Sequence, residues 1–131
     1  LDKKGESMKR DLDLIRVILK DLEEAIPRET IDDTKYHDRY DGAVVRYNMN
    51  LLVNEGFVIK DRIQLSDRER EISYINLKEL TWKGNDFIKA AQDDSLWNKE
   101  KTEVIKPTAS WTFDLLLEWL KAEARTKIGL P

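Results

Sequence analysis

The stretch from Ala43 to Gly84 constrains the fold of this chain more than any other. An apolar run, AVVRYNMNLLVNE, is stopped by Gly56 and followed by two strand-like runs, FVIKDRIQL and EISYINLKEL. Glycine often ends a helix because it adopts the left-handed conformation without steric cost. A helix, a glycine stop and a hairpin in this order are typical of a winged helix-turn-helix, so we predict an α+β fold of that class.

The central helix has two faces. At about 3.6 residues per turn, the face that can meet a core holds Val44, Val45, Leu51 and Leu52. The other face can meet a partner and holds Ala43, Arg46, Tyr47, Asn50 and Asn54. Arginine can chelate guanine and asparagine can chelate adenine in the major groove. Adding two hairpin cations, we predict a DNA-contact set of Arg46, Tyr47, Asn50, Asn54, Lys60 and Arg62; the alternative is a solvated face.

The hairpin itself favours that alternative, because its cations are interleaved with acids. Lys60, Arg62, Arg68 and Arg70 stand against Asp61, Asp67, Glu69 and Glu71. A wing that binds phosphate needs basic residues without acidic residues among them. Charges of alternating sign are more typical of a solvated turn.

The segments before the central helix divide into a clear helix and an ambiguous stretch. From Asp11 to Ile26, apolar residues recur on one face, which predicts a core helix, and Pro27 ends it because proline lacks a donor. The stretch RETIDDTKYHDRYD has weak periodicity, and it is compatible with a short helix led by Thr30 or with a short strand. Asp41 is placed to cap the central helix.

Three further helices are expected after the hairpin. Thr81 is a candidate N-cap for a helix that carries Trp82, Phe87, Ile88 and Ala91. Ser95 is a candidate N-cap for a second helical run, which ends before Pro107. The last helix runs from Trp111 to about Lys127, with Gly129 as a stop signal. We predict a shared core of Ile15, Ile18, Leu22, Leu51, Leu52, Phe57, Trp82 and Phe87.

The last helix has two apolar flanks. One holds Phe113, Leu116, Leu117 and Leu120, and the other holds Trp111, Leu115 and Trp119. Since monomers seldom expose large apolar patches, we predict that the second flank binds a second copy of the chain or another protein. The alternative is that the run from Ser95 to Ile105 folds back over it.

Composition limits the class of protein. A chain of 131 residues suits one domain, which we place at 8–131, with a core at 8–92, a helical extension at 95–129 and a tail at 1–7. The absence of cysteine excludes disulfides and thiolate metal sites, and no apolar run reaches the length of a membrane span, so we expect a cytoplasmic protein. The formal charge of -3 argues against non-specific nucleic-acid binding.

Chemistry-bearing motifs are weak. His37 lies near Asp33, Asp38 and Asp41, but it is the only histidine, and there is no cysteine and no glycine-rich phosphate loop. We therefore predict no enzyme, no metal and no cofactor. Asn48 lies among apolar residues of the central helix, where a buried, hydrogen-bonded amide is expected.

The segments MKRDLDLIR, YNMNLLVNEGFV and LTWKGNDFIKAAQDDSLWNK together resemble an uncharacterised family of bacterial and phage proteins, domain of unknown function 2513. The resemblance runs from Met8 to Lys101. It implies a winged-helix fold and a bacterial or phage origin, and it supplies no activity. The family has histidines where this chain has Asn48 and Asn85, so any role of those histidines is absent here. The expected function is a DNA-binding or regulatory module; the alternative is a protein-interaction module that dimerises or docks through its last helix.

Overall fold

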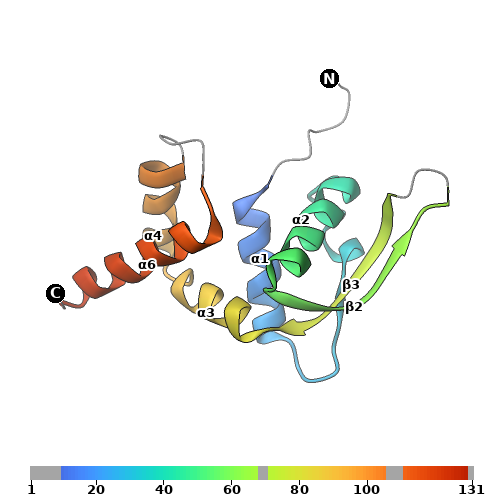
Figure 1. The fold of residues 1–131 in the computed structure, drawn as a ribbon, viewed down its shortest axis with the longest axis horizontal. Helices are drawn as coiled ribbons and strands as arrows, with labels where there is room; N and C mark the ends of the chain where they lie inside the picture. The colour runs from blue at the N-terminus through green and yellow to red at the C-terminus, as the bar shows by residue number, and fades with distance from the viewer. Residues whose placement is uncertain (1–9, 68–70, 106–110, 130–131) are drawn as a thin grey trace. The chain divides into compact units, whose positions relative to one another are not determined.

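The computed structural model describes residues 10–67, 71–105 and 111–129 (Figure 1). This part of the chain is α+β, with five α-helices and one three-stranded antiparallel sheet. The chain divides into two units, residues 1–85 and 86–131, and each is described by itself. Predictions that concern residues 1–7, Arg68, Glu69, Arg70 and Pro107 lie outside the described residues.

The predicted first helix is confirmed as α1, Leu12–Glu24. Asp11 caps it, since its Oδ1 accepts a hydrogen bond from the Leu14 backbone N at 3.0 Å. The buried face consists of Leu12, Leu14, Ile15, Ile18, Leu19 and Leu22. Extending that face to Ile26 was wrong, because the backbone is already extended at Ala25, and Ile26 is 68% exposed.

The ambiguous stretch forms both of the structures considered for it, in succession. Strand β1 is Ile31–Asp32, and the 3-10 turn η1 is Asp33–Tyr36. Asp32, not Thr30, leads the turn, since its Oδ1 accepts from the Thr34 backbone N at 3.0 Å. Each element is too short to show a hydrophobic period, which is why the sequence left the choice open.

The central helix is α2, Gly42–Glu55, and both of its predicted boundaries are confirmed. Asp41 Oδ1 accepts from the Ala43 backbone N at 2.8 Å, and Gly56 has a left-handed φ of 81°. Asn48 is fully buried, as predicted, and its amide joins two helices. Its Nδ2 donates to the Val44 carbonyl at 2.9 Å, while its Oδ1 accepts from the Asp11 backbone N at 2.9 Å.

The predicted hairpin consists of β2, Val58–Leu65, and β3, Ile72–Leu80, and the strand order is β1-β3-β2. The register of the hairpin is irregular, because the pairing of β2 with β3 shifts at three points along β2. These shifts interrupt the regular alternation of inward and outward side chains along β2: Ile59 and Leu65 are 43% and 58% exposed, whereas Val58 is buried.

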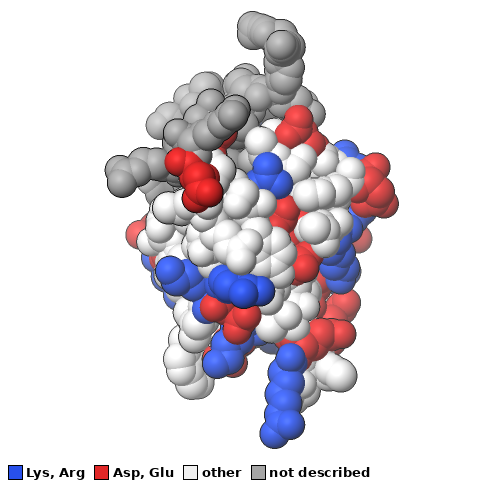
Figure 2. Space-filling model, turned by 90° about the vertical axis from the view of Figure 1, so that its right-hand side faces the viewer, with Lys and Arg blue, Asp and Glu red and all other residues white. Residues whose placement is uncertain are grey.

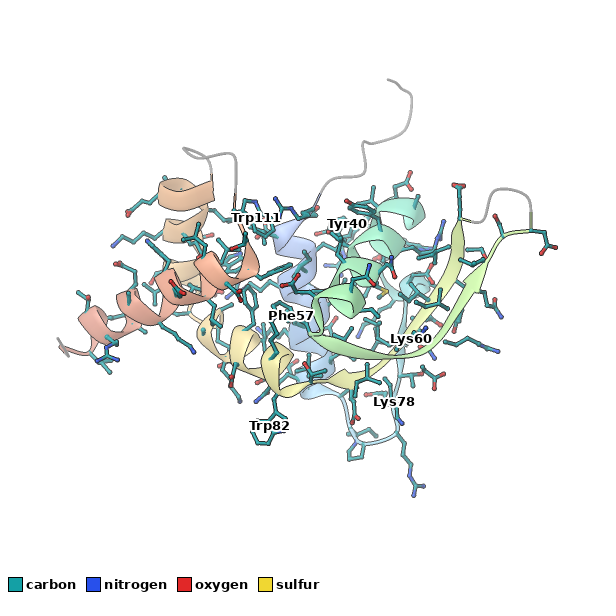
Figure 3. The ribbon with its side chains drawn as sticks, viewed as in Figure 1. Tyr40, Phe57, Lys60, Lys78, Trp82 and Trp111 are labelled. Atoms are coloured by element: carbon teal, nitrogen blue, oxygen red, sulfur yellow. The ribbon has the colours of Figure 1, made fainter. Side chains whose placement is uncertain are left out.

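Helix α3, Trp82–Ala90, follows the hairpin, and the predicted cap is confirmed because the Gly84 backbone N donates to Thr81 Oγ1 at 3.1 Å. Placing Trp82 in the core was wrong: its side chain is 88% exposed and points away from the helix (Figure 3). At about 100° per residue, Trp82 lies about 160° around the helix from Gly84, which is buried. Of the other predicted core residues, Leu51 is half-buried and the rest are buried.

The second unit contains α4, Asp94–Glu100, the π-helical turn η2, Lys101–Ile105, and α6, Phe113–Lys127. The prediction that Ser95 caps α4 was wrong. Asp93 caps this helix instead, because its carboxylate accepts from the Leu96 backbone N at 3.0 Å and also binds the Ser95 hydroxyl at 2.7 Å. Thr112 caps α6, and the predicted stop is confirmed by Gly129, with a φ of 81°.

Aromatic rings form the core of the second unit. Phe87 meets Phe113 edge-on at a centroid distance of 5.5 Å and Trp97 at 6.4 Å. Ion pairs tie α4 and its cap to α6: Lys99 to Glu123 at 2.6 Å, and Lys127 to Asp93 at 2.5 Å. Within the described residues, no helix is long and apolar enough to cross a bilayer.

Candidate functional site

Arg46, one of the six residues predicted to contact DNA, is bound by other residues of the protein itself. Its Nη1 lies 3.2 Å from Oδ2 of Asp33, and its Nε donates to the Ile72 carbonyl at 2.9 Å. The other oxygen of Asp33 accepts from the Ile75 backbone N at 3.1 Å. Asp33 is almost fully buried. The pair therefore joins η1, α2 and β3, and the guanidinium is committed to internal contacts.

His37 completes this cluster. Its Nε2 lies 2.9 Å from the same Asp33 oxygen. The two residues that were grouped from the sequence, His37 and Asp33, are therefore in direct contact. Asp38 is not part of the cluster; its carboxylate lies 3.8 Å from Arg39. In the described ranges, His37 bonds to no hydroxyl or thiol side chain, so the cluster supplies no nucleophile next to a base.

The remaining residues of the α2 face are accessible and uncharged. Tyr47 is 37% exposed, Asn50 is half-buried and Asn54 is exposed. A groove of about 320 Å³ runs between α2 and the hairpin, and it is lined by Ala43, Arg46, Tyr47, Asn50, Ser66, Glu71, Ile72 and Ser73. On the face drawn in Figure 2, Lys and Arg side chains are interleaved with Asp and Glu and form no broad basic area.

The two hairpin cations predicted for DNA contact, Lys60 and Arg62, are exposed on β2. The Arg62 guanidinium lies 5.7 Å from the ring centre of Tyr74, whose hydroxyl donates to Asp32 Oδ2 at 3.2 Å. Tyr74 precedes the buried Ile75, so Arg62 lies on the sheet face opposite that residue. The structure thus does not bring Arg62 to the internally bound Arg46.

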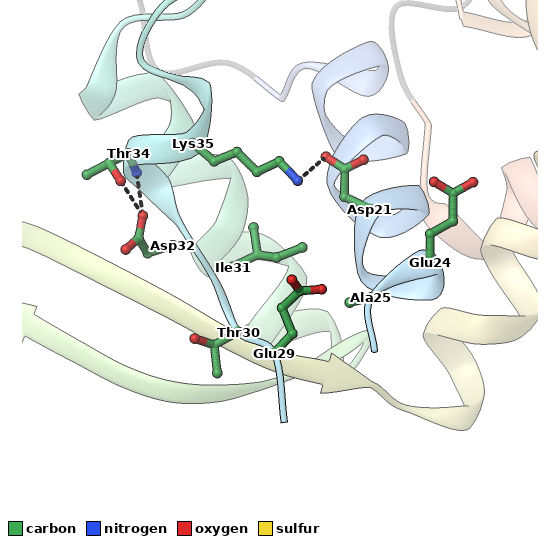
Figure 4. Close-up of a pocket in the computed structure, with 9 residues that line it drawn as sticks. All are labelled: Asp21, Glu24, Ala25, Glu29, Thr30, Ile31, Asp32, Thr34 and Lys35. Carbon is green, nitrogen blue, oxygen red and sulfur yellow. Dashed lines mark hydrogen bonds and ion pairs between the residues drawn. The ribbon is translucent and has the colours of Figure 1, made fainter. Parts of the chain in front are cut away.

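An acidic pocket of about 390 Å³ lies between the end of α1 and β1 (Figure 4). Its lining residues are Asp21, Glu24, Ala25, Glu29, Thr30, Ile31, Asp32, Thr34 and Lys35. Asp21 is already engaged, since Lys35 lies 3.5 Å away and the Tyr36 hydroxyl donates to it at 2.6 Å. Burial, with this bond to Asp21, raises the pKa of Tyr36 above its usual range. Across the described residues, no group of three or more side chains is arranged to hold a metal ion.

Part of the predicted interface at α6 is buried in the core of the second unit. Trp111 is 9% exposed and meets Phe113 at a ring-centre distance of 5.4 Å. Leu115 is 44% exposed, and Trp119 is half-buried. Of the predicted interface, Leu115 and Trp119 therefore remain as an accessible apolar strip.

Glu100, at the end of α4, was not singled out from the sequence. It is fully buried, and neither of its carboxylate oxygens has a hydrogen-bond partner among the described residues. Burial alone raises the pKa of Glu100 to about 8. In the sequence it appears as one of many surface acids, although its spacing of four residues from the buried Leu96 was a usable signal.

Replacing Glu100 by glutamine should stabilise the protein at neutral and alkaline pH. In the wild type, the folded state holds the proton of Glu100 up to about pH 8, whereas the unfolded state releases it near pH 4.5. Stability therefore falls as pH rises between these values, and the variant loses this dependence. The free energy of unfolding in urea should favour the variant by up to about 4 kcal/mol at pH 8 and by little at pH 4.5.

The matched control for this prediction is Glu118→Gln, at an exposed position of α6. It should leave the wild-type pH profile unchanged. A Glu100→Gln profile parallel to that of the wild type would show that Glu100 is ionised in the folded protein.

Comparison with known proteins gives a family but no activity. The model of a family described as a hypothetical protein, DUF2513, matches residues 9–110. An uncharacterised protein of Haemophilus influenzae is 32% identical over 122 residues, which cover 93% of this chain and 97% of that protein. No solved structure matches the chain.

Proposed function

The chain belongs to the DUF2513 family, and we propose that it is a winged-helix regulatory module of bacterial or phage cytoplasm that binds another macromolecule and catalyses no reaction. The order α1, β1, η1, α2, β2, β3 and the strand order β1-β3-β2 support the winged-helix assignment. In this arrangement η1 takes the place of the first helix of the helix-turn-helix, α2 is the second, and the hairpin is the wing.

Protein is the partner that the α2 face fits best. The observation that carries this proposal is the internal binding of Arg46, which leaves Tyr47, Asn50 and Asn54 as the accessible polar side chains of the face. Affinity for DNA depends largely on cations that neutralise phosphates, and α2 offers no unbound cation. Uncharged polar and aromatic side chains suit a protein contact.

DNA binding is the second candidate, and the spacing of the same side chains favours it. Tyr47, Asn50 and Asn54 follow one another at intervals of three and four residues, which places them along one side of α2. Asparagine can chelate adenine from such a position in the major groove.

A mobility-shift titration on mixed-sequence duplex DNA separates the candidates. At 50 mM and 200 mM salt, we expect no shift at roughly 10 µM protein, because too few cations face the duplex. A shift that weakens at the higher salt and is lost in Asn50→Ala would establish DNA binding and overturn the protein-only proposal. Such a contact would be worth about 1 to 3 kcal/mol.

The control for that titration is Asn98→Ala, which removes an exposed asparagine of α4. It should behave as the wild type does. Arg46→Ala is a poorer probe, because it also removes the internal bonds to Asp33 and Ile72.

A further inference from the structure

The groove between α2 and the hairpin contains hydrogen-bonding groups that the protein itself does not use. Both Tyr47 and Asn50 line it, and within the described residues neither the Tyr47 hydroxyl nor the Asn50 amide has a hydrogen-bond partner. Asn50 is half-buried. Its amide offers two donors and one acceptor to the groove, so it suits a ligand that supplies both kinds of group.

Arg46 supplies a further donor to the same groove. A guanidinium has five N–H groups, and the contacts within the described residues use two of them, one to the Ile72 carbonyl and one to Asp33. The side chain is 23% exposed and lines the groove, so a ligand can reach the remaining N–H groups. Because Asp33 matches the charge of Arg46, this donor suits a neutral acceptor, such as a peptide carbonyl, better than a phosphate.

Glu71 gives the groove a negative charge. It is exposed immediately before β3, and among the described residues it has no ion-pair partner. With Arg46 and Asp33 matched, the charge of Glu71 is the unmatched one among the lining residues. Charge complementarity therefore favours a cationic group on the ligand and disfavours phosphate.

The size of the groove limits what can enter it. Its volume of about 320 Å³ is close to the lower limit for ligand pockets, about 300 Å³. A short segment of chain fits such a space, whereas a folded surface does not.

We propose that the groove between α2 and the hairpin binds a short extended segment of a protein partner, with a lysine or arginine of that segment paired with Glu71. A peptide unit has one N–H and one C=O, which match the acceptor and the donors of the Asn50 amide, and a neighbouring carbonyl accepts from Arg46. The proposal rests on the proposed function, because it takes protein as the partner of the α2 face. It adds the place and the chemistry of the contact.

Selection of short random peptides, displayed on bacteriophage, against the full chain tests the proposal. We expect the wild type to enrich peptides with lysine or arginine at one common position, and Glu71→Lys to enrich an acidic residue there. A synthetic peptide from the wild-type set, followed by fluorescence anisotropy, should bind Asn50→Ala about threefold to tenfold more weakly. It should bind Glu71→Lys at least about tenfold more weakly, because like charges then meet.

Two control variants leave the groove lining unchanged. Asn98→Ala removes an exposed asparagine of α4, and Glu79→Lys reverses an exposed charge near the other end of β3. Both should bind the peptide as the wild type does. Circular dichroism checks that every variant keeps its fold.

Several outcomes would overturn the proposal: no enriched peptide, a preference for basic residues that persists in Glu71→Lys, or unchanged affinity of Asn50→Ala for the peptide. Peptide binding lost only in Trp119→Glu would also overturn it, but would leave intact the proposal that the chain binds protein. Failure of the proposed function would instead appear as DNA binding in the mobility-shift titration.

Discussion

Replacing Gly84 by alanine should lower the free energy of unfolding by about 3 kcal/mol or more, or prevent folding altogether. A Cβ at this position would lie 2.8 Å from the carbonyl carbon of Phe57 and closer still to its oxygen. These are backbone atoms, so no side-chain rotation relieves the overlap. The first turn of α3 would have to move, and the bond from the Thr81 backbone N to the Phe57 carbonyl, 3.0 Å long, would be strained or lost.

Helix propensity acts in the opposite direction. In an exposed helix, alanine stabilises by about 1 kcal/mol relative to glycine, and Gly84 lies within α3. The steric term is larger because the obstacle is main chain, so we expect net destabilisation.

The control is Gly56→Ala, because Gly56 has a left-handed φ of 81°, and an added Cβ would meet no atom of the described residues within 4 Å apart from its own chain neighbours. That variant should lose about 1 to 2 kcal/mol through backbone strain alone. Urea unfolding of both variants gives the comparison. A Gly84→Ala protein at least as stable as the wild type would show that α3 does not rest on Phe57 in solution.

Replacing Asp33 by alanine should cost about 3 to 5 kcal/mol of stability. Its buried carboxylate is the common partner of Arg46, His37 and the Ile75 backbone N. Removing it leaves a half-buried guanidinium without its counter-charge and a buried N–H without an acceptor. Asp33→Asn should cost less, because an amide oxygen can still accept from Ile75.

A double-mutant cycle shows how much of the stability lost in Asp33→Ala comes from leaving Arg46 unpaired. If much of it comes from the stranded guanidinium, Asp33→Ala combined with Arg46→Met should lose less than the sum of the two single variants. Asp38→Ala, at an exposed carboxylate, is the control and should change stability by less than about 0.5 kcal/mol. A loss below about 1 kcal/mol for Asp33→Ala would mean that the cluster is not formed in solution.

Element boundaries could be predicted because they depend on neighbours in the chain. Asp11, Asp41 and Thr81 each cap the helix that they precede, and Gly56 ends α2 in the left-handed conformation. Side-chain oxygens reach backbone donors two or three residues away, so such signals need no tertiary context. At α4, where Asp93 and Ser95 are both cap-forming residues, the carboxylate of Asp93 accepts the hydrogen bond from the helix backbone.

The direction of each side chain was less predictable in the hairpin and in α3. The register shifts along β2 change which residues face inward, and pairing with β3 sets those shifts. The prediction that Trp82 lies in the core rested on its assignment to the apolar side of its own helix, and it was wrong because Trp82 is 88% exposed. The buried side of α3 is decided by Gly84, the residue small enough to approach the Phe57 backbone.

In the candidate site, too, one part could be predicted from the sequence and another part could not. Sequence periodicity determined that Arg46, Tyr47 and Asn50 share the outer side of α2, and this is how the helix is built. Only the tertiary structure decided that Arg46 is bound by Asp33 and the Ile72 carbonyl, which lie 13 and 26 residues away in the chain. Helical periodicity is a local property and can be read from the sequence. Pairing of distant polar groups depends on which elements fold next to each other, and that is fixed when the whole unit packs.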